Sequence, residues 1–356
     1  MARIAFIGVG DISGIYLKNV METFDNLELI GVCDLIPEKA QRAVEKYPQI
    51  KKIYKDMYEA FADPEVDIIL NITRAYQHYD VTKAALMAGK HVYSEKPLAT
   101  TIDQGVELIK LAREKGLMLG GAPDTFLGAG IQTCKRLIDA GFIGKPLAAT
   151  AFMMSNGPES WHPDPEFFYK PGAGPMMDMG PYYTTALVYL LGRVEYLNAM
   201  TNISFKQRVA TCPAKKGLVI DVETPTYVTG NLRFESGATA TMIMSFETKH
   251  ASLPNIEIYG EKGTLTVPDP NTFGGPIRLY LPEEGQVKEI PLMYPYKENS
   301  RALGLSKMAE ALDKGEGDFV TSWKLTGHVL DVMTGMLRSG ESGQTIKMLD
   351  LESITE

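Results

Sequence analysis

The chain has 356 residues, of which 45% are hydrophobic and 22% charged, a composition typical of a folded globular protein and a length that suits two domains better than one. Its formal net charge of -8, with lysines and arginines spread thinly, argues against a nucleic acid as partner. The three scattered cysteines have no CxxC spacing, which argues against a disulfide framework or a cysteine zinc site and favours a reducing cytoplasm.

The chain begins with MARIAFIGVGDISG, in which the apolar run is only about six residues long. Such a run is too short for the core of a signal peptide and far too short to span a bilayer. We therefore expect a cytoplasmic protein that does not bind a membrane.

From Ala2 to about Gly121, short apolar segments alternate with helix-like stretches. Strands rich in β-branched residues that are separated by amphipathic helices are typical of βαβ units, hence of a parallel sheet covered on both faces. Residues 1–121 are thus predicted to form a doubly wound α/β domain of the Rossmann type. The expected strands are 3–10, 27–34, 66–73, 90–97 and 117–122, and the expected helices end near Phe24 or span 37–47, 78–89 and 101–116.

Residues 122–356 have a different pattern, in which strand-like segments follow one another with turn residues between them. This pattern is typical of a large open, mainly antiparallel sheet, so we expect an α+β domain for substrate binding and oligomerisation. The exposed face of the segment TATMIMSF, 239–246, would need cover, which predicts a homo-oligomer, a dimer or a tetramer, through this sheet. The expected strands lie within 145–154, 194–205, 224–237, 238–248, 255–269 and 276–283, and the expected helices are 130–141, 179–192, 301–315 and 323–340.

Glycines follow the first predicted strand directly. Gly8 and Gly10 open a GxGxxG-like turn in which Ser13 takes the third place. In that pattern the first glycine makes a tight turn, and the second lets the backbone approach a pyrophosphate at the helix N-terminus. An ordinary structural turn is the alternative explanation. We predict a dinucleotide contact here that includes Asp11 and Ile12.

Asp34 ends the second predicted strand, where an acid can accept hydrogen bonds from the adenosine ribose and repel a 2′-phosphate. The alternative is that Asp34 caps the helix that begins at Pro37. The acid therefore favours NAD over NADP as cofactor, and the strand, glycine turn, helix, strand and acid together predict a dinucleotide site.

The segment HVYSEKPLAT places Glu95, Lys96 and Pro97 where the 90–97 strand stops. In an open parallel sheet the ligand crevice lies beyond the carboxyl ends of the strands, so Lys96 is expected to point toward the nicotinamide. Pro97 disfavours helical backbone at Lys96 and keeps it in an extended or turn conformation. The alternative is a solvated lysine that precedes the next helix.

Four segments together resemble one known family: GVGDIS, the CD that ends the second strand, AGKHVYSEKP and GAGPMMDMGPYY. They look like the NAD(P)-dependent sugar and polyol oxidoreductases that include glucose-fructose oxidoreductase and the inositol dehydrogenases, the Gfo/Idh/MocA family, and the resemblance covers nearly the whole chain. It implies hydride transfer between a nicotinamide and a hydroxyl-bearing carbon of a sugar, glycoside or inositol. The family's lysine, which binds the reacting oxygen, corresponds to Lys96, and the aspartate of its DxGxH segment corresponds to Asp178. Tyr182 stands where the family has the histidine.

The hydroxyl proton needs an acceptor with a suitable pKa. Three candidates remain open at this stage: Tyr182 activated by a neighbouring cation, Lys96 itself, or His162 in the loop SWHPDPEFFYKPGAGP. The aromatic rings of this loop are suited to the apolar faces of a sugar, so Trp161 and Tyr169 are predicted to bind substrate together with His162, Asp178 and Tyr182. An ordinary surface loop or a subunit contact is the alternative explanation.

The resemblance also implies further cofactor contacts. They lie after the 66–73 strand and near residue 122, namely Thr73, Arg74, His78, Asp124 and Thr125, in addition to Glu95, Lys96 and Pro97. For His78 the alternative is a satisfied helix residue with no ligand contact. The histidines lack HxxxH or HExxH spacing, so no metal site is expected. Two other functions fit the same residues: an NAD-using glycosidase that works by oxidation and elimination, and a non-catalytic nucleotide or sugar sensor.

Overall fold

The computed structural model describes residues 1–354, and the contacts within it divide the chain into two compact units. Unit 1 consists of Met1–Asp124, Asn299–Leu330 and the residues from Asp350, whereas unit 2 consists of Thr125–Glu298 and Asp331–Leu349. The sequence assigned everything after residue 121 to a second domain. The structure differs because helix α9 contacts β1 and therefore belongs to the first unit.

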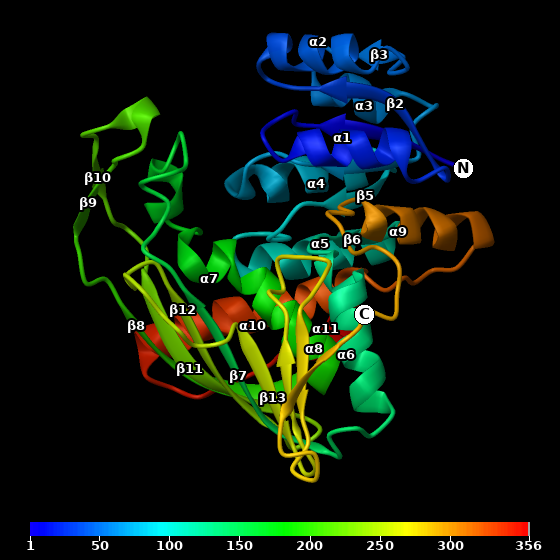
Figure 1. Cartoon of the computed structure of the whole chain (residues 1–356). Helices are drawn as coiled ribbons and strands as arrows, with labels where there is room; N and C mark the ends of the chain where they lie inside the picture. The colour runs from blue at the N-terminus through cyan, green and yellow to red at the C-terminus, as the bar shows by residue number, and fades with distance from the viewer. Residues whose placement is uncertain (355–356) are drawn as a thin grey trace. The chain divides into compact units, whose positions relative to one another are not determined.

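Unit 1 contains a six-stranded sheet with the order β3-β2-β1-β4-β5-β6, and all its neighbouring pairs are parallel (Figure 1). The strand order reverses at β1, which lies between β2 and β4. The carboxyl ends of strands beside such a reversal form the ligand crevice of doubly wound folds. The predicted parallel sheet is confirmed. The strands are β1 Ala2–Ile7, β2 Leu27–Cys33, β3 Lys52–Ile53, β4 Ile68–Asn71, β5 His91–Ser94 and β6 Leu119–Gly121.

Helices cover both faces of this sheet, so its central strands are buried. Ile68, Ile69 and Leu70 of β4 are fully buried, as expected for a strand packed on both sides. The helices of unit 1 are α1 Ser13–Glu22, α2 Pro37–Lys46, α3 Met57–Ala62, η1 Ala75–Gln77, α4 His78–Met87, α5 Ile102–Glu114, α9 Leu303–Lys314, α11 Leu351–Ile354 and the first part of α10 Trp323–Ser342.

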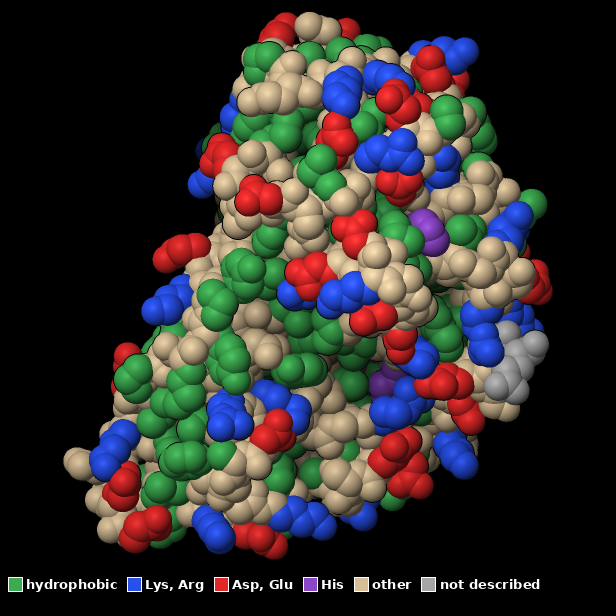
Figure 2. All heavy atoms as spheres, turned by 90° about the vertical axis from the view of Figure 1, so that its right-hand side faces the viewer, with side chains coloured by type: hydrophobic (Ala, Val, Ile, Leu, Met, Phe, Trp, Pro, Cys, Tyr) green, Lys and Arg blue, Asp and Glu red, His purple; other side chains and the backbone are tan. Residues whose placement is uncertain are grey.

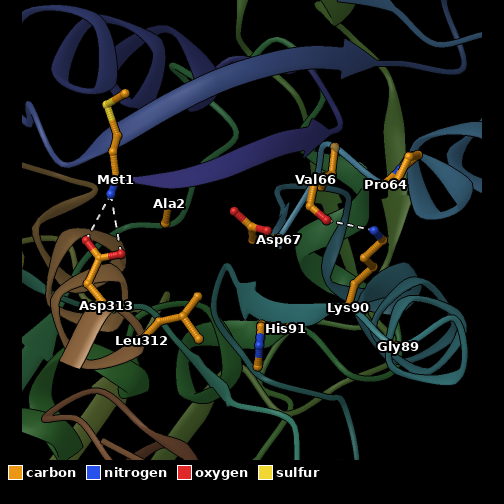
Figure 3. Close-up of a pocket in the computed structure, with 10 residues that line it drawn as sticks. All are labelled: Met1, Ala2, Pro64, Val66, Asp67, Gly89, Lys90, His91, Leu312 and Asp313. Atoms are coloured by element: carbon orange, nitrogen blue, oxygen red, sulfur yellow. Dashed lines mark hydrogen bonds and ion pairs between the residues drawn. The ribbon is translucent and has the colours of Figure 1, made fainter. Parts of the chain in front are cut away.

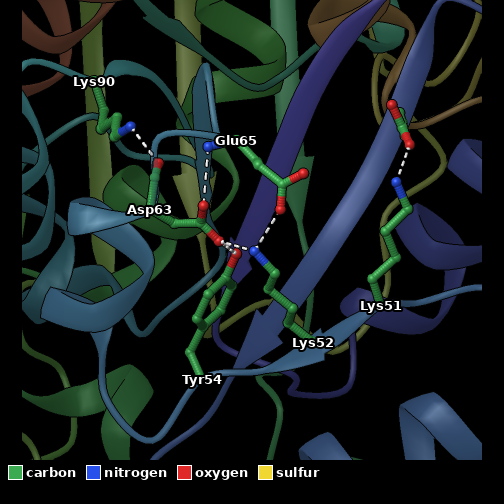
Figure 4. A network of polar contacts seen from close by, with 7 residues as sticks. Lys51, Lys52, Tyr54, Asp63, Glu65 and Lys90 are labelled. Atoms are coloured by element: carbon green, nitrogen blue, oxygen red, sulfur yellow. Dashed lines mark hydrogen bonds and ion pairs between the residues drawn. The ribbon is translucent and has the colours of Figure 1, made fainter.

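A network of polar side chains lies beside β3, the edge strand of this sheet (Figure 4). Lys52 Nζ donates to Asp63 and Glu65, at 2.6 Å from each, and the Tyr54 hydroxyl donates to Asp63 at 2.7 Å. Burial opposes ionisation of Asp63, but the hydrogen bonds from Lys52, Glu65 N and Tyr54 outweigh it and lower the pKa of Asp63 to about 2. The network therefore holds a carboxylate at neutral pH.

Unit 2 contains a nine-stranded sheet with the order β16-β15-β14-β13-β7-β12-β11-β8-β17. β7 and β12 run parallel, and the other described pairs of this sheet are antiparallel. The predicted mainly antiparallel sheet is confirmed. Its strands are β7 Pro146–Met154, β8 Val194–Asn202, β11 Tyr227–Phe234, β12 Thr239–Ser245, β13 Ile256–Gly260, β14 Thr264–Val267, β15 Ile277–Tyr280, β16 Val287–Ile290 and β17 Ile346–Lys347, while β9 Gln207–Val209 and β10 Val219–Asp221 form a separate pair.

Residues alternate between a buried and an exposed face along β12. Met242 and Met244 are buried, whereas Thr239 and Thr241 are exposed. The methionines of the TATMIMSF segment thus belong to the interior, and the open face carries threonines and Ile243. The helical segments of unit 2 are η2 Thr125–Leu127, α6 Ala129–Asp139, η3 Glu166–Tyr169, α7 Gly174–Asp178, α8 Gly180–Leu191, η4 Pro213–Lys215 and the remainder of α10.

The surface carries charges of both signs. On the face shown in Figure 2, lysines and arginines are interspersed with aspartates and glutamates, without a large area of one sign. Among the helices of residues 1–354, none combines the length and the apolar character that a membrane crossing requires.

Candidate active-site residues

The turn after β1 requires glycine at its first position. Gly8 has φ +98°, and a Cβ atom there would lie 2.6 Å from the Ile72 carbonyl oxygen. Gly10 is different, because a Cβ at this position would meet nothing within 4 Å. The backbone at Gly10 is therefore open to a ligand, as the GxG pattern predicts.

Ser13 replaces the third glycine without disturbing the turn. Its hydroxyl donates to the Gly10 carbonyl at 2.6 Å, and its backbone N–H donates to the same oxygen at 3.1 Å. Helix α1 begins at Ser13 with no side-chain cap and no acidic residue in its first turn. The positive end of this helix dipole is thus compatible with a phosphate anion.

Asp34 follows β2 and lies beside the glycine turn. Its Oδ2 accepts a hydrogen bond from Val9 N at 2.6 Å, and its Oδ1 accepts one from Ile36 N at 2.8 Å. Helix α2 has Ile36 as its N-cap residue, so Asp34 lies outside the helix that it was considered to cap. Each carboxylate oxygen can accept a further hydrogen bond, and this capacity fits a ribose diol. The glycine turn, the uncapped helix and this acid together fit a dinucleotide.

The loop after β4 is held by two buried side chains. Asn71 Nδ2 donates to the His78 carbonyl at 3.1 Å, and Asn71 Oδ1 accepts from the Thr73 hydroxyl at 2.7 Å. His78 Nε2 lies 3.0 Å from the Thr73 carbonyl oxygen, and its Nδ1 lies 2.7 Å from the Pro97 carbonyl oxygen. Thr73 and His78 were predicted to contact the cofactor, and the structure brings their loop into contact with the loop of Lys96.

The Glu95–Lys96–Pro97 segment follows β5 and is anchored by the buried Glu95. Oε1 of Glu95 accepts from the Tyr16 hydroxyl at 2.7 Å, and Oε2 accepts from Lys96 N at 2.8 Å. Burial and the Glu95 charge raise the pKa of Tyr16 well above its ordinary value, so its hydroxyl stays a donor. The Lys96–Pro97 peptide bond is cis. The sequence offered no signal for Tyr16, because it lies on α1 and far from Glu95 along the chain.

Asp124 is the last residue of unit 1 and is fully buried within the chain. Its Oδ2 accepts from Gly304 N at 3.0 Å. Burial raises the pKa of Asp124 to about 6, the Glu95 charge adds to this increase, and Gly304 N and Arg301 oppose it. Thr125, in unit 2, is also buried and donates to the Pro270 carbonyl at 2.6 Å. Both residues were predicted to contact the cofactor, whereas the structure gives their side chains internal partners.

Asp178 and Tyr182 lie on consecutive helices of unit 2. Asp178 is the last residue of α7, and Tyr182 belongs to the first turn of α8, where it is buried. Close packing joins the two helices, because a Cβ at Gly180 would lie 2.8 Å from Met176 Sδ. The DMGPY segment therefore forms a tightly packed junction between α7 and α8, which fixes the backbone positions of Asp178 and Tyr182.

The aromatic loop of unit 2 does not expose all the rings that the sequence suggested. Trp161 is 66% exposed, whereas Tyr169 is fully buried. The Tyr169 hydroxyl lies against the turn at Gly157, where a Cβ would be 2.6 Å from it. Tyr169 thus belongs to the interior, unlike the predicted sugar-facing ring, because the η3 turn directs it inward.

His162 has a defined hydrogen-bonding role in the same loop. Its ring packs against Phe167 and Phe168, with ring centroids 5.3 and 4.9 Å apart. Asp164 N donates to His162 Nδ1 at 3.0 Å, so Nδ1 is an acceptor and the neutral ring carries its proton on Nε2. His162 is therefore prepared to donate a hydrogen bond through Nε2. It can accept a proton only after the contact with Asp164 breaks.

Among residues 1–354, no cluster of three or more histidine, cysteine or acidic side chains has the geometry to hold a metal ion.

Two family descriptions match the chain. "Oxidoreductase family, NAD-binding Rossmann fold" matches residues 2–121, which makes the protein an NAD-binding oxidoreductase. "GFO/IDH/MocA C-terminal domain" matches residues 131–266. The chain belongs to the Gfo/Idh/MocA family.

Several named relatives are distant in sequence. An inositol 2-dehydrogenase/D-chiro-inositol 3-dehydrogenase of Lactiplantibacillus plantarum is 32% identical over 154 residues, which span 41% of this chain and 42% of the relative. The D-glucoside 3-dehydrogenase of Escherichia coli is 27% identical over 300 residues, or 81% of each chain. A levoglucosan dehydrogenase solved in complex with NADH has a TM-score of 0.82 at 17% identity, covering 98% of this chain and 99% of the other.

Proposed function

We propose that this enzyme transfers a hydride between NAD and a hydroxyl-bearing carbon of a sugar, glycoside or inositol, with Lys96 at the reacting oxygen. The observation that carries the proposal is the anchored turn at the carboxyl end of β5, where Glu95 binds Lys96 N at 2.8 Å and Tyr16 at 2.7 Å. Relatives named as inositol and glucoside dehydrogenases support the substrate class. NAD, when bound, supplies the hydride acceptor.

Lys96 contributes a positive charge and hydrogen-bond donors for the substrate oxygen. As the carbon loses hydride, the hydroxyl must lose its proton, and a positioned cation stabilises the alkoxide character of that oxygen. The hydrogen bond from Asp164 N to His162 Nδ1 supports a donor role for His162. The candidate proton acceptors are Lys96, Tyr182 and, once its contact with Asp164 N breaks, His162; Asp178 is proposed to bind and orient a substrate hydroxyl.

We further propose that Asp34 selects NAD over NADP. Its carboxylate is fixed by the backbone N–H groups of Val9 and Ile36, so a 2′-phosphate near this position would meet a negative charge that cannot turn away.

We also propose a homo-oligomer that forms through the open face of the nine-stranded sheet. Met200, Thr229, Ile243 and Phe152 lie in register across four neighbouring strands, and Met200 is 76% exposed. Such a row, in which three of the four side chains are apolar, is suited to burial against a second copy. Light scattering of Ile243→Glu would test this: a smaller particle than the wild-type protein supports the proposal, and an unchanged mass contradicts it.

A substrate panel tests the reaction. Sugars, inositols and glycosides are assayed with NAD and with NADP, and the appearance of reduced nicotinamide is followed by absorbance. The proposal predicts stoichiometric reduction of NAD with at least one member of the panel and a lower kcat/KM with NADP. Release of an aglycone with no net reduction would replace this function by an oxidation–elimination glycosidase, and no turnover with intact NAD binding would indicate a sensor.

A further inference from the structure

We infer that His78 is a positioning residue that ties the Lys96 loop to the start of α4, through a hydrogen bond that its Nδ1 donates to the Pro97 carbonyl. The inference rests on the proposed function for the role of Lys96. It adds a residue that touches neither the reacting carbon nor the reacting oxygen but sets where the lysine stands relative to α4.

The two contacts of His78 are both to main-chain carbonyls. Nδ1 lies 2.7 Å from the Pro97 oxygen, directly after Lys96, and Nε2 lies 3.0 Å from the Thr73 oxygen. A carbonyl oxygen only accepts, and burial lowers the pKa of His78, so the neutral ring has one N–H to donate. The shorter contact assigns this N–H to Nδ1, which donates to the Pro97 carbonyl, while Nε2 lies beside the Thr73 carbonyl without donating to it.

The burial of His78 explains why loss of this contact would change the position of the loop. Its side chain is 1% exposed, so water cannot replace a lost donor. A buried carbonyl without a donor is destabilised, and the loop that carries it moves to find another partner. Asn71 anchors the loop after β4 through Thr73. The Pro97 carbonyl has His78 as its side-chain donor, and Glu95 holds the other side of Lys96.

A buried histidine that merely fills space would tolerate any substitution of similar shape. The positioning role distinguishes the two amides that replace one ring nitrogen at a time. In His78→Asn the amide nitrogen takes approximately the place of Nδ1 and keeps the Pro97 contact. In His78→Gln it reaches the place of Nε2, beside the Thr73 carbonyl, and loses the Pro97 contact.

The two variants are expected to differ in kcat. His78→Gln should lower kcat roughly 10- to 100-fold, because a loose Lys96 loop misplaces the lysine by a fraction of an ångström to an ångström, while the Kd for NADH stays within about threefold. His78→Asn should keep both kcat and the Kd for NADH within about threefold of wild type, because the hydrogen bond to the Pro97 carbonyl is retained. NADH affinity is measured by fluorescence titration.

His91 provides the matched control. It begins β5, at the opposite end of the strand from Lys96, where it lines a cavity of about 450 Å³ with Asp67 and Lys90 (Figure 3). Its Nδ1 accepts from Met118 N at 2.9 Å. His91→Asn and His91→Gln should lower stability without separating kcat from NADH affinity.

A second measurement reads the geometry without turnover. The chain has 5 histidines, so a long-range ¹H–¹⁵N spectrum of protein labelled at histidine nitrogens is simple to assign with single substitutions. The inference predicts a protonated Nδ1 for His78, and an unprotonated Nδ1 for the neutral rings of His91 and His162. An unprotonated Nδ1 at His78, or equal effects of the two amides on kcat, would overturn it. If no panel substrate reacts, the proposed function fails, but the spectrum still decides the role of His78.

Discussion

Replacing the buried acid at the end of unit 1, Asp124→Asn, should stabilise the protein, and the gain should grow with pH. Burial raises the pKa of Asp124 from 3.8 to about 6. In the unfolded chain the carboxyl ionises near its ordinary pKa, so between these two values the folded state binds more protons than the unfolded state. The free energy of unfolding therefore falls as pH rises through this window.

The magnitude follows from the difference between the two pKa values. At about 1.36 kcal/mol per pKa unit, the gap between 3.8 and about 6 corresponds to about 3 kcal/mol of destabilisation above pH 7. The same linkage leaves only roughly 1 kcal/mol at pH 4.5. Asparagine removes the ionisation and keeps an oxygen that can accept from Gly304 N, so Asp124→Asn should regain most of this difference at high pH.

The assay is the thermal midpoint of wild type and Asp124→Asn, measured from pH 4.5 to pH 8. A gain of about 3 kcal/mol corresponds to roughly 6–12 °C for a unit of this size. Comparing the shift in the thermal midpoint at pH 8 with the shift at pH 4.5 cancels effects of the substitution that do not depend on pH. Asp103→Asn, at an exposed position on α5, is the control and should show no such trend. A shift of Asp124→Asn that is flat with pH would refute the assignment of a destabilising ionised carboxylate at this position.

Three further predictions concern unit 1. Asp63→Asn should destabilise unit 1 by roughly 1–2 kcal/mol, a value reduced for solvent screening because Lys52 is 37% exposed. Since the pKa of Asp63 is lowered to about 2, the stabilisation by its carboxylate exists above about pH 4 and disappears as the pH falls toward 2. Urea unfolding at several pH values would detect this dependence. Gly8→Ala should lower the free energy of unfolding by at least about 2 kcal/mol, because of the positive φ and the 2.6 Å approach to Ile72, whereas Gly14→Ala, with open space around its Cβ, should be neutral or slightly stabilising. Gly10→Ala should leave the melting temperature unchanged but weaken NADH binding. Equal melting temperatures for the Gly8 and Gly14 variants would contradict this prediction. Asp34→Asn should raise the ratio of kcat/KM for NADP to that for NAD by roughly 10- to 100-fold, and an unchanged ratio would remove Asp34 from cofactor selection.

The sequence predicted the architecture well because both sheets have clear hydrophobic periodicity. Buried runs such as 68–70 in β4 and the alternation along β12 identify the parallel and antiparallel sheets, respectively. Very short elements, such as β3 and α7, were not predicted, because a few residues carry no measurable period.

Contacts between residues distant in the sequence could not be predicted in the same way. Nothing in the local pattern indicates that Gly304 N binds Asp124, that Tyr16 binds Glu95, or that α9 packs in unit 1. The glycine turn and the acid at the end of the second strand could be predicted from the sequence, because their chemistry depends on neighbours in the chain. Tyr169 was misjudged as a sugar-facing ring because aromatic composition does not distinguish a binding loop from a small core.

The most direct test of the proposed reaction is the rate of a single turnover in Lys96→Met. Methionine keeps the apolar stem and removes the ammonium group, so the fold and the cofactor site should be preserved. We predict a Kd for NADH within about threefold of the wild-type value and a hydride-transfer rate at least roughly 10³-fold lower, since the group that stabilises the reacting oxygen is lost. A rate within tenfold of wild type, with the same substrate and normal NADH binding, would contradict the central role given to Lys96.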